Sequence, residues 1–204
     1  VCGIPPFIST LGMMTLLRGV ILVYTKGSPI PIKSDAYKFF GKGSIAGIPV
    51  PVIILIIVFL LAHYILTQTS YGRSVYAVGG NREAARLSGI RVKTSEFLVY
   101  TLNGLMCGMA GLILTARLGS AQSTSGTGIE MDAIAAVILG GTSLSGGVGF
   151  VLPTVVGAMI MGIIDNILTL MNVNPHATNI VKGAVILIAV LVDKNGKYLS
   201  AKAE

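Results

Sequence analysis

Three long stretches without aspartate, glutamate, lysine or arginine constrain the fold of this chain more than any other feature. They cover residues 43–71, 97–116 and 133–164. A helix needs roughly 20 mostly apolar residues to cross the hydrocarbon of a membrane, and several blocks reach that length. Only 11% of the residues are charged, against about a quarter in soluble domains, and the mean hydropathy is +0.82. The sequence therefore predicts an all-α, polytopic helical membrane protein.

About six membrane segments are expected, of which one is short and broken. The five longer segments are residues 7–24, 50–67, 97–116, 150–170 and 180–192, and polar loops fill 26–47, 68–96 and 117–128. The short segment begins at Ala133 and is cut off after Leu139 by the glycine-rich stretch 140–149. About a dozen residues from Ile134 into the glycine-rich stretch cannot cross roughly 30 Å as a simple helix, so this backbone must be buried in protein or face water. A break beside a transport path and a plain tight turn both fit.

Basic residues in the short loops predict the orientation, because cytoplasmic loops carry an excess of lysine and arginine. Two segments are basic enough to be assigned to the cytoplasm, the loop 68–96 (Arg73, Arg82, Arg86, Arg91, Lys93) and the tail (Lys194, Lys197, Lys202). Counting membrane crossings back from the tail also places the loop 68–96 in the cytoplasm, provided that the short segment crosses the membrane. The same count places the loop 26–47 outside, although it also carries positive charge (Lys26, Lys33, Lys38, Lys42).

Several chemistries lack the residues that they need. Two cysteines, Cys2 and Cys107, form neither a disulfide framework nor a metal site, and Cys107 is expected to be a small packing residue. Glycines 141 and 146 have the spacing of a phosphate loop, but the lysine that must follow is absent. His63 and His176 each stand alone in the sequence, so we expect them to be interfacial side chains and not metal ligands. We therefore expect no metal, no bound cofactor, no nucleic acid and no enzymatic activity.

Residues 79–90, reading GGNREAARLSGI, form a polar insert between two apolar segments. We expect a short helix here, with Ala84 and Ala85 leaving room for a partner's groove, Glu83 and Arg86 at the rim of the contact, and Gly89 as a left-handed cap. Such a knob suits docking to a motor protein that drives a transporter from outside. An ordinary amphipathic loop helix is the alternative. The predicted docking residues are Asn81, Glu83, Ala84, Ala85, Arg86, Leu87 and Gly89.

From this knob onward the chain strongly resembles the ribose-type permease subunit of bacterial ATP-binding-cassette sugar importers. The matching text is YGRSVYAVGGNREAARLSGIRV at 71–92, LTARLGSAQ at 114–122, IEMDAIAAVILGGTSLSGGVG at 129–149 and IVKGAVILIAVLVD at 180–193, and PPFISTLGMMTLLRG at 5–19 also fits. The resemblance covers nearly the whole chain. It implies one transmembrane permease domain over 1–204, with a cytoplasmic coupling loop at 68–96, in the bacterial cytoplasmic (inner) membrane. It also implies a fragment that lacks N-terminal helices.

The resemblance further implies the partners. Two permeases, identical or different, would form the path through the lipid, and an extracytoplasmic sugar-binding protein would deliver the substrate. A separate cytoplasmic ATPase would dock on the knobs and bind ATP-Mg. Ribose is the best single expectation for the sugar, with galactose, xylose and other small polyols left open.

A carboxylate inside a membrane segment is costly and is a candidate functional group by default. Asp165-Asn166 stands where the resemblance leads us to expect two asparagines. Asp165 could line the sugar path, pair with a basic group, or lie near the interface with little effect. The candidate path residues are Asp132, Gly140, Gly141, Asp165 and Asn166.

Small residues on the segment 97–116 indicate close helix contact. Gly104 and Gly108 have the Gly-x-x-x-Gly spacing that lets helices approach in lipid, and Gly111 extends the same face. We expect these three glycines to pack against another helix.

One alternative function belongs to a different class. A secondary carrier driven by an ion gradient often has interrupted helices and intramembrane carboxylates, which the break after Leu139 and Asp165 would fit. A secondary carrier would have no use for the docking knob at 79–90, however. A membrane-embedded enzyme has no nucleophile–base or metal set to support it.

Overall fold

The computed structural model describes residues 6–174, 177–185, 187 and 191. Among these residues four helices are long and apolar enough to cross a membrane, α1 (Pro6–Thr25), α3 (Val50–Gln68), α6 (Val92–Leu118) and α8 (Val151–Leu170). The shorter helices are α2 (Asp35–Lys42), α4 (Ser70–Gly80), α5 (Arg82–Leu87) and α7 (Ile129–Leu139). Residues 177–185 are also helical. The predicted all-α, polytopic membrane fold is confirmed.

Two compact units divide the chain, one of residues 1–54 and 105–127, the other of residues 55–104 and 128–204. The first unit contains two pairs of short antiparallel strands. The strand β1 (Ile30–Pro31) pairs with β4 (Ser120–Ala121), and β2 (Ser44–Ile45) pairs with β3 (Ile48–Pro49). The polar loop predicted over 26–47 is therefore wrong in part. It contains the helix α2, which Ser34 caps by accepting a hydrogen bond from the backbone N–H of Tyr37.

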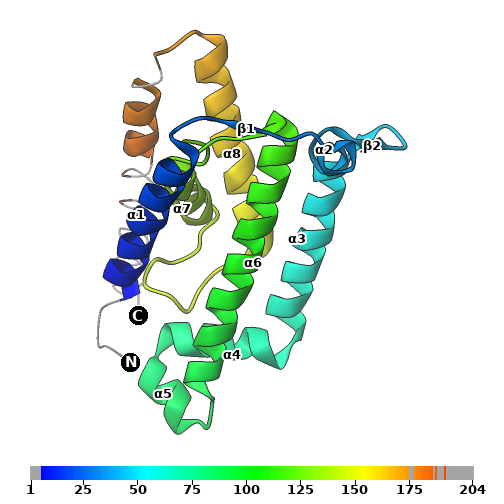
Figure 1. Cartoon of the computed structure of the whole chain (residues 1–204). Coiled ribbons are helices and arrows are strands. Elements are labelled where there is room, and N and C mark those ends of the chain that lie inside the picture. The colour runs from blue at the N-terminus through cyan, green and yellow to red at the C-terminus, as the bar shows by residue number, and fades with distance from the viewer. Residues whose placement is uncertain (1–5, 175–176, 186, 188–190, 192–204) are drawn as a thin grey trace. The chain divides into compact units, whose positions relative to one another are not determined.

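In the second unit, α7 and α8 form an antiparallel hairpin (Figure 1). Two glycines allow the close approach, because a Cβ on Gly157 would collide with the carbonyl oxygen of Ala136, and one on Gly140 would lie 2.5 Å from the Cα of Thr154. The core of this hairpin is the buried cluster of Ala135, Ala136 and Met161. With 11 residues, α7 is about 16 Å long and does not cross a bilayer alone.

Several predicted boundaries agree with the structure to within a few residues, since α1, α3 and α8 cover the segments predicted at 7–24, 50–67 and 150–170. Pro153 lies in the first turn of α8, where proline leaves no helical hydrogen bond unmade. The loop predicted over 68–96 is wrong in detail, because two helices and the start of α6 occupy it. The tail lysines, Cys2 and His176 lie outside the described residues.

Cys107 is exposed on α6, so the packing role expected of it stays a prediction. The same holds for the face of Gly104, Gly108 and Gly111, where a Cβ would meet nothing within 4 Å. Helix packing at this face stays a prediction.

Candidate functional site: a capped docking helix and an ion-paired helix hairpin

Asn81 joins α4 to α5 and caps both helices. Its backbone N–H donates to the carbonyl of Ala77, and its side-chain Oδ1 accepts from the N–H of Ala84 at 3.0 Å. An asparagine here satisfies an N–H that has no partner within α5. The two helices therefore meet at a fixed corner, and no free loop separates them.

The other end of α5 is closed by Gly89, whose φ of +84° places it in the left-handed region. The N–H of Ile90 donates to the carbonyl of Ala85, and the N–H of Gly89 donates to that of Arg86, both at 3.1 Å. These two bonds form a Schellman motif. The left-handed cap predicted at Gly89 is confirmed.

Ala84 and Ala85 do not share the role expected of them. Ala85 is buried at 4% exposure within the second unit, so it packs α5 onto its own chain and cannot receive a partner. Consecutive residues of a helix point about 100° apart, and Ala84 accordingly lies on the exposed side. Residues three or four positions apart share a face, so the exposed surface of α5 is built on Ala84 and Leu87.

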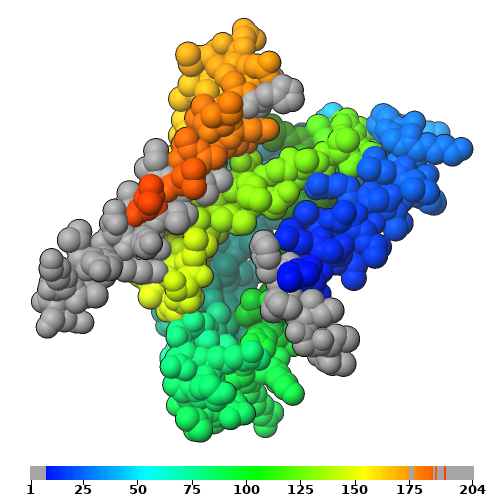
Figure 2. All heavy atoms as spheres, turned by 90° about the vertical axis from the view of Figure 1, so that its left-hand side faces the viewer, coloured from blue at the N-terminus to red at the C-terminus, as the bar shows by residue number. Residues whose placement is uncertain are grey.

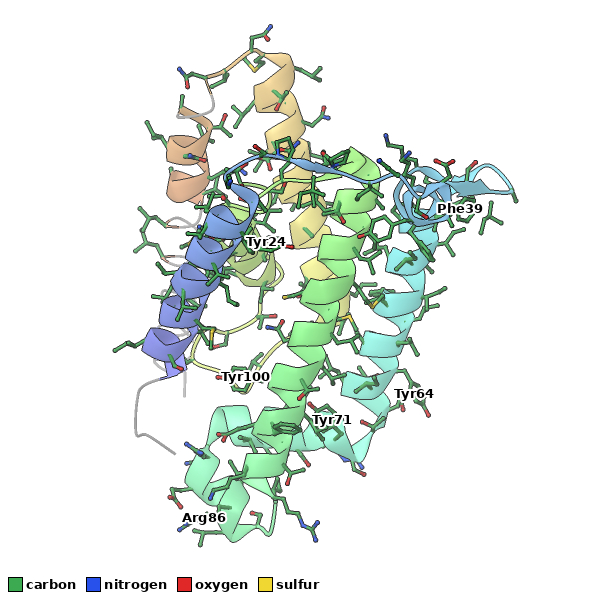
Figure 3. The ribbon with its side chains drawn as sticks, viewed as in Figure 1. Tyr24, Phe39, Tyr64, Tyr71, Arg86 and Tyr100 are labelled. Atoms are coloured by element: carbon green, nitrogen blue, oxygen red, sulfur yellow. The ribbon has the colours of Figure 1, made fainter. Side chains whose placement is uncertain are left out.

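Leu87 is 81% exposed, and charged side chains precede it on the same short helix. Glu83 and Arg86 form an ion pair at 3.2 Å, and Arg82 pairs with Glu96 at 3.0 Å. Arg86 lies on the outer side of α5 (Figure 3). In Figure 2 the atoms of α4 and α5, coloured turquoise to green, form one continuous exposed surface. An apolar anchor inside a charged rim has the anatomy of a protein-binding surface.

The end of α4 crosses the glycine-rich stretch 140–149 with backbone against backbone. A Cβ on Gly79 would lie 2.9 Å from the backbone nitrogen of Gly147, and one on Gly147 would lie 2.8 Å from the Cα of Gly80. Next to the crossing, the hydroxyl of Tyr76 donates to the carbonyl of Gly149 at 2.8 Å. The connection between α7 and α8 is thus packed tightly against α4, the helix that directly precedes α5.

A cleft of about 530 Å³ opens beside this crossing, and mostly apolar side chains of α3, α4 and α8 line it. Sugar hydroxyls need several polar partners, so the cleft does not have the lining of a sugar site. Tyr71 on α4 differs from Tyr76: burial raises the pKa of its hydroxyl, which has no hydrogen-bond partner among the described residues.

At the other end of the α7–α8 hairpin, Lys182 joins two carboxylates. Its Nζ lies 2.8 Å from Oδ2 of Asp132 on α7 and 2.9 Å from Oδ1 of Asp165 on α8. The three side chains are partly buried, with exposures of 19% for Lys182, 25% for Asp132 and 40% for Asp165. Opposite charges that meet inside a membrane segment relieve part of each other's desolvation. The sequence left pairing with a basic group open for Asp165, and the structure shows that pairing.

The other predicted path residues do not join this cluster. Asn166 lies on an exposed face of α8, at a shallow surface groove with Met159 and Gly162. Gly140 is buried against α8, and Gly141 is exposed with a φ of +75°. Lys182 was missed from the sequence, although a lone cation between apolar residues is itself a pointer to a functional or paired group. No group of three metal-ligating side chains occurs among the described residues.

Residues 1–190 match the family described as the permease component of a branched-chain amino acid transport system. The chain belongs to this permease family. It is 53% identical over 191 residues to the ribose import permease protein RbsC of Escherichia coli (strain K12), covering 92% of this chain and 60% of that protein. It is 50% identical over 191 residues to the RbsC of Bacillus subtilis (strain 168), covering 93% and 59%. The xylose transport system permease protein XylH of Escherichia coli (strain K12) is 48% identical over 154 residues, covering 76% and 39%.

The permease thus spans about 60% of the length of the ribose permeases that it matches. No solved structure matches it. The predicted resemblance to ribose-type permeases is confirmed, and the family together with the apolar helices makes this a multi-pass protein of the bacterial cytoplasmic membrane.

Proposed function

We propose that this chain is part of the permease subunit of an ATP-binding-cassette importer that moves a monosaccharide, ribose in the first instance, into the cell. The observation that carries the proposal is the identity of about half of the residues with the ribose permeases over more than nine tenths of this chain. Alternating access would pass the sugar between two permeases, of the same or different sequence. An extracytoplasmic sugar-binding protein would deliver it.

The corner of α4 and α5 is the proposed docking site for the cytoplasmic ATPase, which would bind ATP-Mg. Its support is the combination of Leu87, exposed within a rim of ion pairs, and a backbone fixed at both ends by Asn81 and Gly89. A preorganised helix loses little conformational entropy on binding. Leu87 is therefore expected to act as the anchor.

The docking surface can be tested by replacing Leu87 with serine in the full-length permease and measuring how much ATPase co-purifies with it. Removing an interface anchor weakens binding by about 2 kcal/mol or more, or roughly 30-fold. Leu170→Ser is the matched control, because Leu170 is 75% exposed at the end of α8, far along the chain from α5. Equal recovery of the ATPase with both variants would exclude Leu87 as the anchor.

For the sugar path we propose Asp132, Asp165 and Asn166 on the helices and Gly141 at the break. The Oδ1 of Asp132 is buried and accepts no hydrogen bond among the described residues. A carboxylate oxygen in this state can accept a hydrogen bond from a sugar hydroxyl. Asp165→Asn keeps the shape and removes the charge, so altered uptake kinetics or sugar preference is expected, and unaltered uptake would remove Asp165 from the path.

The whole function is tested by uptake of a panel of labelled sugars in cells with and without the full-length gene. ATP depletion is compared with a protonophore. Loss of ATP-dependent uptake of one sugar on deletion supports the importer and names the substrate. Uptake that collapses with the protonophore but survives ATP depletion would favour the ion-driven carrier, the alternative that the charged cluster of Asp132, Asp165 and Lys182 also fits.

A further inference from the structure

The helix α2 is fastened at the level where two membrane helices end. The hydroxyl of Tyr37 lies 2.8 Å from Oγ1 of Thr115 near the end of α6, and a Cβ on Gly41 would lie 2.8 Å from the Cα of Arg117. On the other side, the carbonyl of Gly43 accepts a hydrogen bond from the N–H of Val50, the first residue of α3, at 2.9 Å. The apolar span of α6 ends at Leu118, and the apolar span of α3 begins at Val50. Thus α2 lies at the edge of the membrane.

The helix α2 has one side that contacts α6 and another that is apolar and exposed. Tyr37 and Gly41, four residues apart, face α6. Ala36, Phe39 and Phe40 share an apolar side by their spacing, and both phenylalanines are nearly half exposed, at 46% and 48%. The described residues of the chain leave almost half of each phenylalanine uncovered on this side.

A second apolar element lies next to this side. The hairpin of β2 and β3 follows α2 directly and exposes Ile45 at 53% and Ile48 at 48%. The hairpin leads straight into α3 at Val50. The apolar surface of α2 is therefore continuous with the apolar surface of a membrane span.

Positive charge gathers around the same segment. Lys33, Lys42 and Arg117 are exposed, and Lys38 is half-buried in an ion pair with Asp35 at 3.1 Å. Asp35 is the one carboxylate in residues 26–54 and 105–127. Cations at the end of an apolar span have their complement in the phosphates of anionic phospholipids. Aromatic and apolar side chains at the same level have theirs in the boundary between headgroups and acyl chains.

We propose that α2 with the β2–β3 hairpin is an interfacial anchor that binds anionic phospholipid. Phe39, Phe40, Ile45 and Ile48 enter the headgroup–acyl boundary, and Lys33, Lys42 and Arg117 bind the phosphates. The anchor explains why a loop assigned to the outer side carries lysines, since they serve lipid binding at a helix that tertiary contacts hold in place. The inference needs only that α3 and α6 span the membrane, and it is independent of what the protein transports.

The absence of tryptophan from these 204 residues permits a direct test. Phe39→Trp and Phe40→Trp are made separately in the full-length permease, after replacement of any tryptophan outside this segment by phenylalanine. Each variant is reconstituted in phosphatidylcholine vesicles that contain phosphatidylglycerol, with bromine on the acyl chains of one lipid at a time. Bromine quenches tryptophan fluorescence on contact, so quenching reports insertion and also which lipid is near.

Two further variants calibrate the depth. Leu60→Trp places the probe on an exposed position in the middle of α3, and Leu87→Trp places it on α5. The probes at 39 and 40 are expected to be quenched strongly by bromine near the headgroup and weakly by bromine near the chain end, where the probe at 60 responds most. Quenching no stronger than that at 87 would overturn the proposal and favour an acidic soluble protein as the occupant.

The preference for anionic lipid is tested by comparing quenching by the two brominated lipids. Quenching at Phe39→Trp should be stronger with brominated phosphatidylglycerol than with brominated phosphatidylcholine at equal content. Each cation near an anionic surface contributes about fivefold in affinity, so Lys33→Gln with Lys42→Gln should reduce this preference strongly, to what Arg117 alone provides, while insertion persists. An unchanged preference in the double variant would refute the phosphate-binding role.

Discussion

Replacing Gly89 by valine tests the docking helix through backbone strain alone. Gly89 has a φ of +84°, and a Cβ at this position would meet nothing within 4 Å. The substitution therefore creates no clash, and its effect comes from the left-handed conformation. For an L-residue with a Cβ this conformation is less favourable by about 1–2 kcal/mol.

That strain falls on the six residues of α5, whose end depends on the two hydrogen bonds of the Schellman motif. A change of about 1–2 kcal/mol shifts the equilibrium between the capped and the frayed helix by roughly 5- to 30-fold toward fraying. If the ATPase docks on the capped helix, sugar uptake should fall by a similar factor. The amount of folded permease should stay the same, because the rest of the chain keeps its contacts.

The assay is uptake in cells together with sugar-stimulated ATP hydrolysis by the complex in proteoliposomes. Gly89→Asn is the matched variant, since asparagine tolerates the left-handed region, and it should retain most of the activity. Gly12→Ala controls for a glycine replaced in open space on a membrane helix. Uptake and stimulated hydrolysis of Gly89→Val equal to those of the original protein would refute the coupling of the cap to docking.

Three further changes have expected outcomes. Lys182→Met should lower the thermal stability of the permease in nanodiscs, because two partly buried carboxylates lose their cation; a midpoint equal to that of the original protein would contradict the pairing. Gly157→Ala should lower the midpoint more than Gly162→Ala, since only the first Cβ collides with α7. Tyr76→Phe loses a hydrogen bond of about 1 kcal/mol. Tyr71→Phe should be neutral or stabilising, because the buried hydroxyl of Tyr71 makes no hydrogen bond among the described residues, and burial raises its pKa so that it is uncharged at neutral pH; equal midpoints for the two variants would refute this assignment.

The membrane spans were predictable because composition determines them directly. The segment predicted at 7–24 and the observed α1 differ by one residue at each end, since apolar length is a property of the sequence alone. The cap at Gly89 was predictable for a similar reason. A glycine after a short helical pattern is a local feature, and no distant contact is needed to fix it.

Tertiary contacts account for the features that the sequence did not reveal. The ends of α2 depend on packing against α6 and α3, and a stretch of eight residues between prolines has no periodicity long enough to stand out. Ala84 and Ala85 look alike in sequence, and only the packing of α5 distinguishes the exposed one from the buried one. The pairing of Lys182 with Asp132 and Asp165 joins residues far apart along the chain, which no local pattern encodes.

The crossing of α4 with the stretch 140–149 has a mechanical consequence. Side chains that separate two elements can change rotamer and absorb a small displacement, as a compliant layer does. Gly79 and Gly147 have no such layer, because their backbones are already in contact. Tightly packed interiors transmit strain instead of absorbing it. A shift of α4 by a fraction of an ångström toward the stretch 140–149 must therefore displace that stretch, and with it the start of α8, by nearly the same amount.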